Sequence, residues 1–121
     1  MTEPRNPKQY DLEDRTRAFA KRARSFVKRV RKTLGNIEDG KQLVRSSGSV
    51  GSNYIEANEA LSKKDFRMRI KICRKEAKES RYWLELVDTE NNPDLENERE
   101  DLAGEAIELM NIFGSILRRS E

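Results

Sequence analysis

The sequence contains no histidine among its 121 residues. Histidine is the commonest general base near neutral pH and the commonest metal ligand, so its absence argues against the most familiar catalytic and metal sites. Cysteine occurs once, as Cys73, which excludes an internal disulfide and fits a reducing cytoplasm. No histidine is available to activate this thiol as a nucleophile. We therefore expect a cytoplasmic protein that is not an enzyme and has no cofactor or metal.

Long apolar runs are also missing. No stretch approaches the ~18–20 apolar residues needed to cross a bilayer, and residues 1–10 lack the hydrophobic centre of a signal peptide. Charged residues make up 39% of the chain and there are only three prolines. Because the apolar residues recur at regular intervals, this composition favours a folded helical protein over a disordered one. We expect one domain and no membrane partner.

Steps of three and four between apolar residues predict four helices, at about residues 11–33, 38–61, 63–89 and 94–119. Residues 1–9 are expected to form a flexible N-terminal segment, and residues 10–119 a single domain. Gly35 has the place of a glycine that ends a helix, Ser62 that of an N-cap, and Asn92 precedes a proline suited to a first turn. The connections are short, so the expected fold is an all-α, up-down-up-down antiparallel four-helix bundle.

The stretch "RSSGSVGSNYIEANEA", residues 45–60, resembles a phosphate-binding loop in its glycines and serines. A loop of that type needs a preceding strand and a lysine followed by serine or threonine after the last glycine, and neither is present. On a helix, these small residues fall on the buried side, where they would let a neighbouring helix approach closely. The residues assigned to this packing role are Ser47, Gly48 and Gly51. A kink and a ligand loop remain as alternatives.

Charge is distributed unevenly along the chain. Residues 1–45 hold 13 Lys/Arg against 6 Asp/Glu, whereas residues 90–121 hold 3 against 9. From Arg15 to Lys32 there are nine basic residues and no acidic one. A helix with this charge gains free energy when phosphates neutralise it and counterions are released. The predicted partner is RNA or an RNA–DNA hybrid, bound through Arg17, Lys21, Arg22, Arg24, Lys28, Arg29, Arg31 and Lys32.

A second interpretation needs no ligand. The fourth helix offers Asp94, Asp101 and Glu108 at seven-residue intervals, with Glu98 and Glu105 nearby, and rows of arginines can pair with such acids. We expect this pairing mainly for the third-helix row, Arg67, Arg74 and Arg81. A merely solvated surface is the alternative for the outward face of the first helix. Glu76 and Glu79 are expected to pair with basic residues of their own helix, because carboxylate metal bundles use a Glu-x-x-His pair that this chain lacks.

Two further sets of residues concern surfaces. A second apolar stripe on the fourth helix indicates a subunit interface, because one stripe per helix suffices for a bundle of this size; it comprises Ala103, Ile107, Met110, Gly114 and Leu117. Beside the core stripe of the first helix lie Ala20, Val27 and Leu34. Tyr82 and Trp83 are expected to widen the buried face of the third helix, with base stacking as the minor alternative.

The chain resembles the small four-helix-bundle proteins encoded in intervening sequences of bacterial 23S ribosomal RNA genes. The likeness covers about residues 10–117 and rests on "YDLEDRT" (10–16), "FAKR" (19–22), "QLVRSSGSVGSNYIEANEALSKKDF" (42–66) and "KEAKESRYWLEL" (75–86). The resemblance implies a ring-like homopentamer with no known catalysis. A related group, the accessory variability determinants of diversity-generating retroelements, implies a basic pentamer that binds nucleic acid and a reverse transcriptase.

Together, these observations predict a homopentameric, nucleic-acid-binding bundle without catalytic residues. A role as the accessory subunit of a retroelement reverse transcriptase is a specific version of that prediction. The alternative is a purely structural oligomer, encoded in a ribosomal RNA intervening sequence, with no nucleic-acid role.

Overall fold

The computed structural model describes residues 7–121, with side chains from Leu12 onward. Within that range the chain forms four α-helices and no strand, namely α1 (Pro7–Arg29), α2 (Leu34–Asn58), α3 (Lys63–Leu86) and α4 (Pro93–Arg119). The predicted all-helical class is therefore confirmed. Of the N-terminal segment predicted to be flexible, residues 7–9 belong to α1, and residues 1–6 lie outside the described residues.

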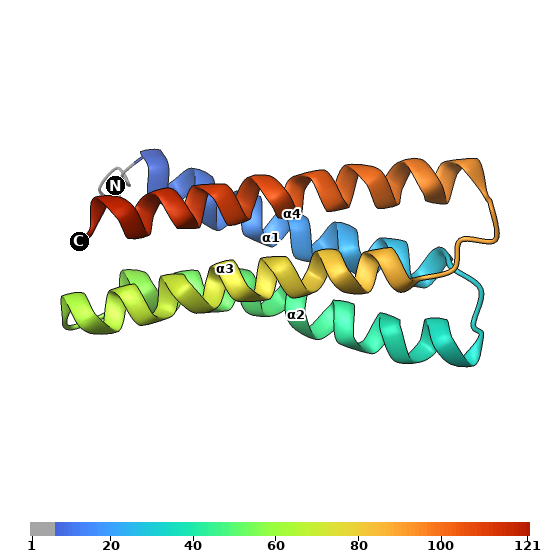
Figure 1. Ribbon diagram of the computed structural model, residues 1–121, viewed down its shortest axis with the longest axis horizontal. Coiled ribbons are helices and arrows are strands. Elements are labelled where there is room, and N and C mark those ends of the chain that lie inside the picture. The colour runs from blue at the N-terminus through green and yellow to red at the C-terminus, as the bar shows by residue number, and fades with distance from the viewer. Residues whose placement is uncertain (1–6) are drawn as a thin grey trace, which may run out of the picture.

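The four helices lie side by side along the long axis of the molecule (Figure 1). The α1–α2 and α3–α4 connections are at one end, and the α2–α3 connection is at the other. Helix α1 packs against α2 and α4, and α3 packs against the same two helices, but the backbones of α1 and α3 do not approach each other. These two helices therefore occupy opposite corners of the bundle. No helix in residues 7–121 is both long and apolar enough to cross a bilayer.

Helices α1, α3 and α4 bury most of the apolar stripe that the sequence predicts, whereas Ile37 and Ile55 of α2 and Leu61 after it are exposed. The largest fully buried side chains are Phe19, Phe26 and Phe113. One polar residue, Arg99, interrupts the stripe of α4, and its guanidinium donates to the Val87 carbonyl at the end of α3 (2.6 Å) and to Glu96 (2.6 Å). The arginine thus satisfies a helix-terminal carbonyl that has no partner within its own helix.

Two of the three predicted helix ends are confirmed. The Ser62 hydroxyl accepts a hydrogen bond from the Asp65 amide, and the Asn92 side chain accepts from the first turn of α4. The assignment of Gly35 as the end of the first helix is wrong. Helix α1 ends at Arg29, and Gly35 lies in the first turn of α2, which Thr33 caps by accepting from the Asn36 amide.

The early start of α2 has a tertiary cause. Asn36 is buried, and its side-chain amide donates to the carbonyls of Arg31 and Asp88 (3.0 and 2.9 Å). Its carbonyl oxygen accepts from the Asp88 amide (2.9 Å). The two bonds with Asp88 tie the start of α2 to the segment after α3, a contact that local sequence does not reveal.

Candidate nucleic-acid interface

The basic residues of α1 divide into an inner flank and an outer face. On the inner flank, Arg15 donates to Glu105 (2.6 Å) and Glu108 (2.9 Å) of α4. One heptad further on, Arg22 pairs with Glu98 (3.3 Å). The bond to Glu105 raises the pKa of Arg15, although burial opposes this shift. Carboxylates of α4 therefore neutralise the inner flank of α1.

Five of the predicted cations form no ion pair with an acid of the described residues. Lys21, Lys28 and Arg29 are exposed, and none of them forms an ion pair with any residue in the part of the chain that the structure describes. Two others bind backbone carbonyls. Arg24 donates to Ala20 (3.1 Å), and Lys32 donates to three carbonyls at the end of α1.

The remaining two predicted contacts are paired with acids at the surface. Arg17 pairs with Asp14 (3.1 Å), and Arg31 pairs with Glu90 (3.0 Å). The Arg31 side chain is 71% exposed and that of Glu90 is 45% exposed. Exposed pairs of this kind contribute about 0–1 kcal/mol, so a phosphate can replace the carboxylate at little cost.

The small residues of α2 lie in a groove beside this face. Residues 45–58 are helical, which confirms the prediction of a helix over a loop. A depression of about 420 Å³ lies between α1 and α2, with Gly48, Gly51 and Ala20 among its lining residues and Lys21 and Arg24 beside them. Ser47 is fully buried, whereas Gly48 lies beneath the Arg24 guanidinium rather than against the backbone of α1. Of the two glycines, Gly51 alone makes the predicted close approach to α1.

Within one chain, the arginine row of α3 does not pair with the acids of α4, so that part of the expectation is wrong, and pairing across subunits stays a prediction. Arg67 donates to the Leu117 carbonyl (2.6 Å) and the Ser120 hydroxyl (2.7 Å), so it caps the end of α4. Arg81 pairs with Glu85 of its own helix (3.0 Å). Three acids of α4, namely Glu98, Glu105 and Glu108, instead pair with arginines of α1.

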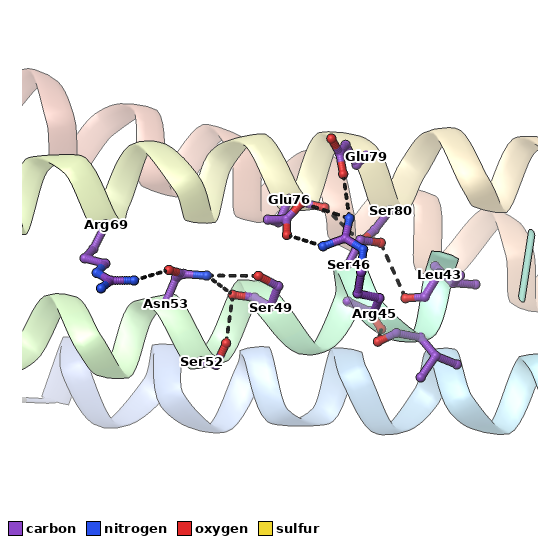
Figure 2. Close-up of polar contacts among 12 residues, drawn as sticks. Leu43, Arg45, Ser46, Ser49, Ser52, Asn53, Arg69, Glu76, Glu79 and Ser80 are labelled. Atoms are coloured by element: carbon purple, nitrogen blue, oxygen red, sulfur yellow. Dashed lines mark hydrogen bonds and ion pairs between the residues drawn. The ribbon is translucent and has the colours of Figure 1, made fainter. Parts of the chain in front are cut away.

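A polar network joins α2 to α3 (Figure 2). Arg45 donates to Glu76 (2.9 Å) and Glu79 (2.9 Å), so these acids pair with α2, and the prediction that they pair within their own helix is wrong. Burial raises the pKa of the Glu76 carboxyl, but hydrogen bonds from Arg45 and Ser49 outweigh burial and lower it overall. The buried hydroxyls of Ser46 and Ser80 bond to each other (2.8 Å). Among the described residues, no three potential metal ligands are grouped to hold an ion.

The reactivity of Cys73 is suppressed by its position. The side chain is fully buried on the core stripe, and burial raises its pKa to about 12. The thiolate, which is the nucleophilic form, is therefore scarce at neutral pH.

The prediction that Tyr82 widens the buried face of α3 is wrong, because its side chain is 54% exposed. Its ring stands edge-on against that of Trp83, which packs on the core.

The proposed interface stripe of α4 is only partly at the surface. Ile107 is 38% exposed, and Ala103 and Met110 are half-buried. Leu117 belongs to the core, and Gly114 is buried beside the guanidinium of Arg118. An interface on this side of α4 would therefore rest on the first three residues.

Comparison with known proteins agrees with this architecture. A crystal structure titled as a protein of unknown function from the S23 ribosomal protein family of Bacteroides thetaiotaomicron is 30% identical, with a TM-score of 0.71. The match covers 92% of this chain and 98% of that one. Curated proteins give no significant match. The sequence profile of the 23S rRNA-intervening sequence proteins matches residues 8–115, and the chain therefore belongs to that family.

Proposed function

We propose that this protein is a non-enzymatic, cytoplasmic nucleic-acid-binding bundle whose ligand is RNA. The observation that carries the proposal is the exposed surface of α1, where Lys21 and Lys28 on the outer face, and Arg29 at the end of the inner flank, have no ion pair to any residue in the described range. Cations held in a row without counter-charges favour a polyanion, since each phosphate they neutralise releases a counterion.

The pairing pattern supports this face as the contact surface. The inner flank of α1 already engages Glu98, Glu105 and Glu108 of α4, so these carboxylates do not neutralise the outer face. Arg17 and Arg31 are bound only in exposed pairs and can exchange their carboxylates for phosphates. Such contacts fix position on a nucleic-acid backbone and carry no direct sequence information.

The proposal includes an up-down-up-down bundle that assembles into a ring-like homopentamer. Connections at alternating ends of the molecule support the first part (Figure 1). Half-exposed apolar residues on α4, among them Ile107, support self-association. A role beside a retroelement reverse transcriptase is a narrower form of the proposal, which the basic α1 favours; template repeats and a reverse-transcriptase gene next to the coding sequence would distinguish it.

Charge reversal on α1 tests the RNA-binding function. A variant with Lys21, Arg24, Lys28 and Arg31 changed to Glu is expected to bind RNA far more weakly, with a flatter salt dependence, and to keep its assembly state in light scattering. The control changes Lys41, Arg118 and Arg119 to Glu, which alters net charge almost as much at other exposed sites. Unchanged affinity in filter binding for the α1 variant would exclude α1 as the contact surface, and a wild-type protein that binds no RNA would favour the rival function, a purely structural oligomer.

A further inference from the structure

Helix α3 carries a second row of cations on the side that faces away from the core. Lys64, Lys71, Lys75 and Lys78 are all exposed. Their spacings of seven, four and three residues place them on one side of the helix, opposite the buried Ile70 and its heptad partners. At 1.5 Å per residue, the row extends over about 20 Å.

Acidic residues of α3 do not neutralise this row, because most of them are engaged elsewhere. Glu76 and Glu79 turn toward Arg45 of α2 (Figure 2), and Glu85 pairs with Arg81 (3.0 Å). The fourth acid, Asp65, lies in the first turn, where it complements the helix dipole. Within the described part of the chain, none of the four lysines forms an ion pair.

The surroundings of the row favour a polyanion over a membrane surface. At its N-terminal end is an open depression of about 510 Å³, lined by Lys63, Lys64, Arg67, Met68 and Lys71. Met68 is the exposed apolar residue within the row, and Tyr82 and Leu86 lie beyond its C-terminal end, whereas a helix that lies on a membrane needs a broad apolar face. Lysine, a compact point charge without bidentate geometry, suits contacts with phosphates of any sequence.

We propose that the outer face of α3 is a second phosphate-binding surface, so that one bundle contacts two segments of nucleic-acid backbone. Helices α1 and α3 occupy opposite corners, and their backbones do not approach each other. The two segments would therefore run along different sides of the molecule. This inference rests on the proposed function in taking nucleic acid as the ligand, but it does not depend on binding by α1.

Lysine footprinting with a short synthetic RNA duplex tests the two surfaces together. The protein is acetylated with and without the duplex, and the modified lysines are identified by mass spectrometry. We expect protection of Lys71, Lys75 and Lys78 on α3 and of Lys21 and Lys28 on α1. Lys41, exposed on α2 beside Glu38, is the internal control that should not change.

The outcomes separate the two proposals. Protection on α1 alone overturns the α3 surface, and protection on α3 alone overturns the α1 surface while supporting this inference. A duplex that does not bind, or that binds without protecting either set, overturns both.

A substitution series gives an independent measurement. The variant with Lys71, Lys75 and Lys78 changed to Gln should bind the duplex about tenfold more weakly or worse, and its salt slope should fall by about 2 to 3, somewhat less than one per lost contact. All three side chains are exposed, so the change should leave the fold intact. A Lys41→Gln variant is the matched control. Equal affinity and salt slope in the triple variant and the wild-type protein would overturn the inference.

Discussion

Gly51 of α2 lies directly against Thr16 of α1. A methyl group at Gly51 would be 2.9 Å from Thr16 Oγ1 and 3.2 Å from its Cβ. Thr16 cannot turn aside freely, because it is buried and its hydroxyl donates to the Leu12 carbonyl (2.7 Å). The absence of a side chain at Gly51 therefore sets how closely the two helices approach.

Gly51 and Gly48 should respond in opposite ways to alanine. Gly51→Ala is expected to destabilise the fold by about 1 kcal/mol or more, because overpacking outweighs the gain in helix propensity. At Gly48 the added methyl meets only the mobile end of Arg24, at 3.2 Å, so Gly48→Ala should be neutral or stabilising by up to about 1 kcal/mol. Urea denaturation of both variants measures the difference. Similar destabilisation by both would mean that Gly48 is also a close contact.

The arginine pairs of α1 should differ in strength according to burial. A double-mutant cycle on Arg15 and Glu105, whose side chains are 29% and 18% exposed, is expected to give a coupling energy of about 1 kcal/mol. The same cycle on the more exposed Arg31 and Glu90 should give less than about 0.5 kcal/mol. Equal coupling energies in the two cycles would contradict the division of α1 into an inner flank that is held in ion pairs with α4 and an outer face whose carboxylate partners a phosphate can replace.

The core of the fold could be predicted because burial imposes a period on each helix. Ile70, Cys73 and Ala77 of α3 recur at steps of three and four, and all are fully buried. The helix ends were harder to predict. Gly35 was assigned to the wrong helix because the start of α2 depends on the bonds between Asn36 and Asp88, which join segments far apart in the sequence.

The sequence shows which residues of the candidate site are basic, but it does not show which group each of them contacts. Arg15 and Arg67 both begin rows with seven-residue spacing, and nothing local distinguishes them. In the structure Arg15 faces Glu105, whereas Arg67 reaches the Leu117 carbonyl. The direction of each row depends on how the helices are rotated about their axes. The lysines of α3 carry no distinguishing signal in the sequence, because Glu76 and Glu79 lie among them, and it is the structure that shows these acids bound to Arg45 of α2.

Stability should fall in acid partly through Glu76. Its pKa is lowered below the ordinary value of 4.5, so the carboxylate stabilises the fold above that pH, and the contribution is lost as the pH falls through the lowered pKa. Glu76→Gln should therefore reduce the loss of unfolding free energy between neutral and acid pH. Glu85→Gln, which alters an exposed pair with Arg81, is the control and should leave the profile nearly unchanged. A Glu76→Gln profile parallel to that of the wild-type protein would show that Glu76 titrates normally.

Assembly should depend on the half-exposed apolar residues of α4. Ile107→Asp places a charge on a side chain that is 38% exposed and outside the core of the subunit, so the helix should persist while an apolar subunit contact is lost. We expect a smaller mass by light scattering, with unchanged helix content by circular dichroism; Met110→Asp should also lower the mass, but with some loss of stability because Met110 packs against the core. Gln42→Asp on the exposed surface of α2 is the control for the added charge. A wild-type mass for both α4 variants would place any subunit interface elsewhere, and the apolar flank of α1 and α2 around Val27, Gly40 and Val44 would then be the next surface to test.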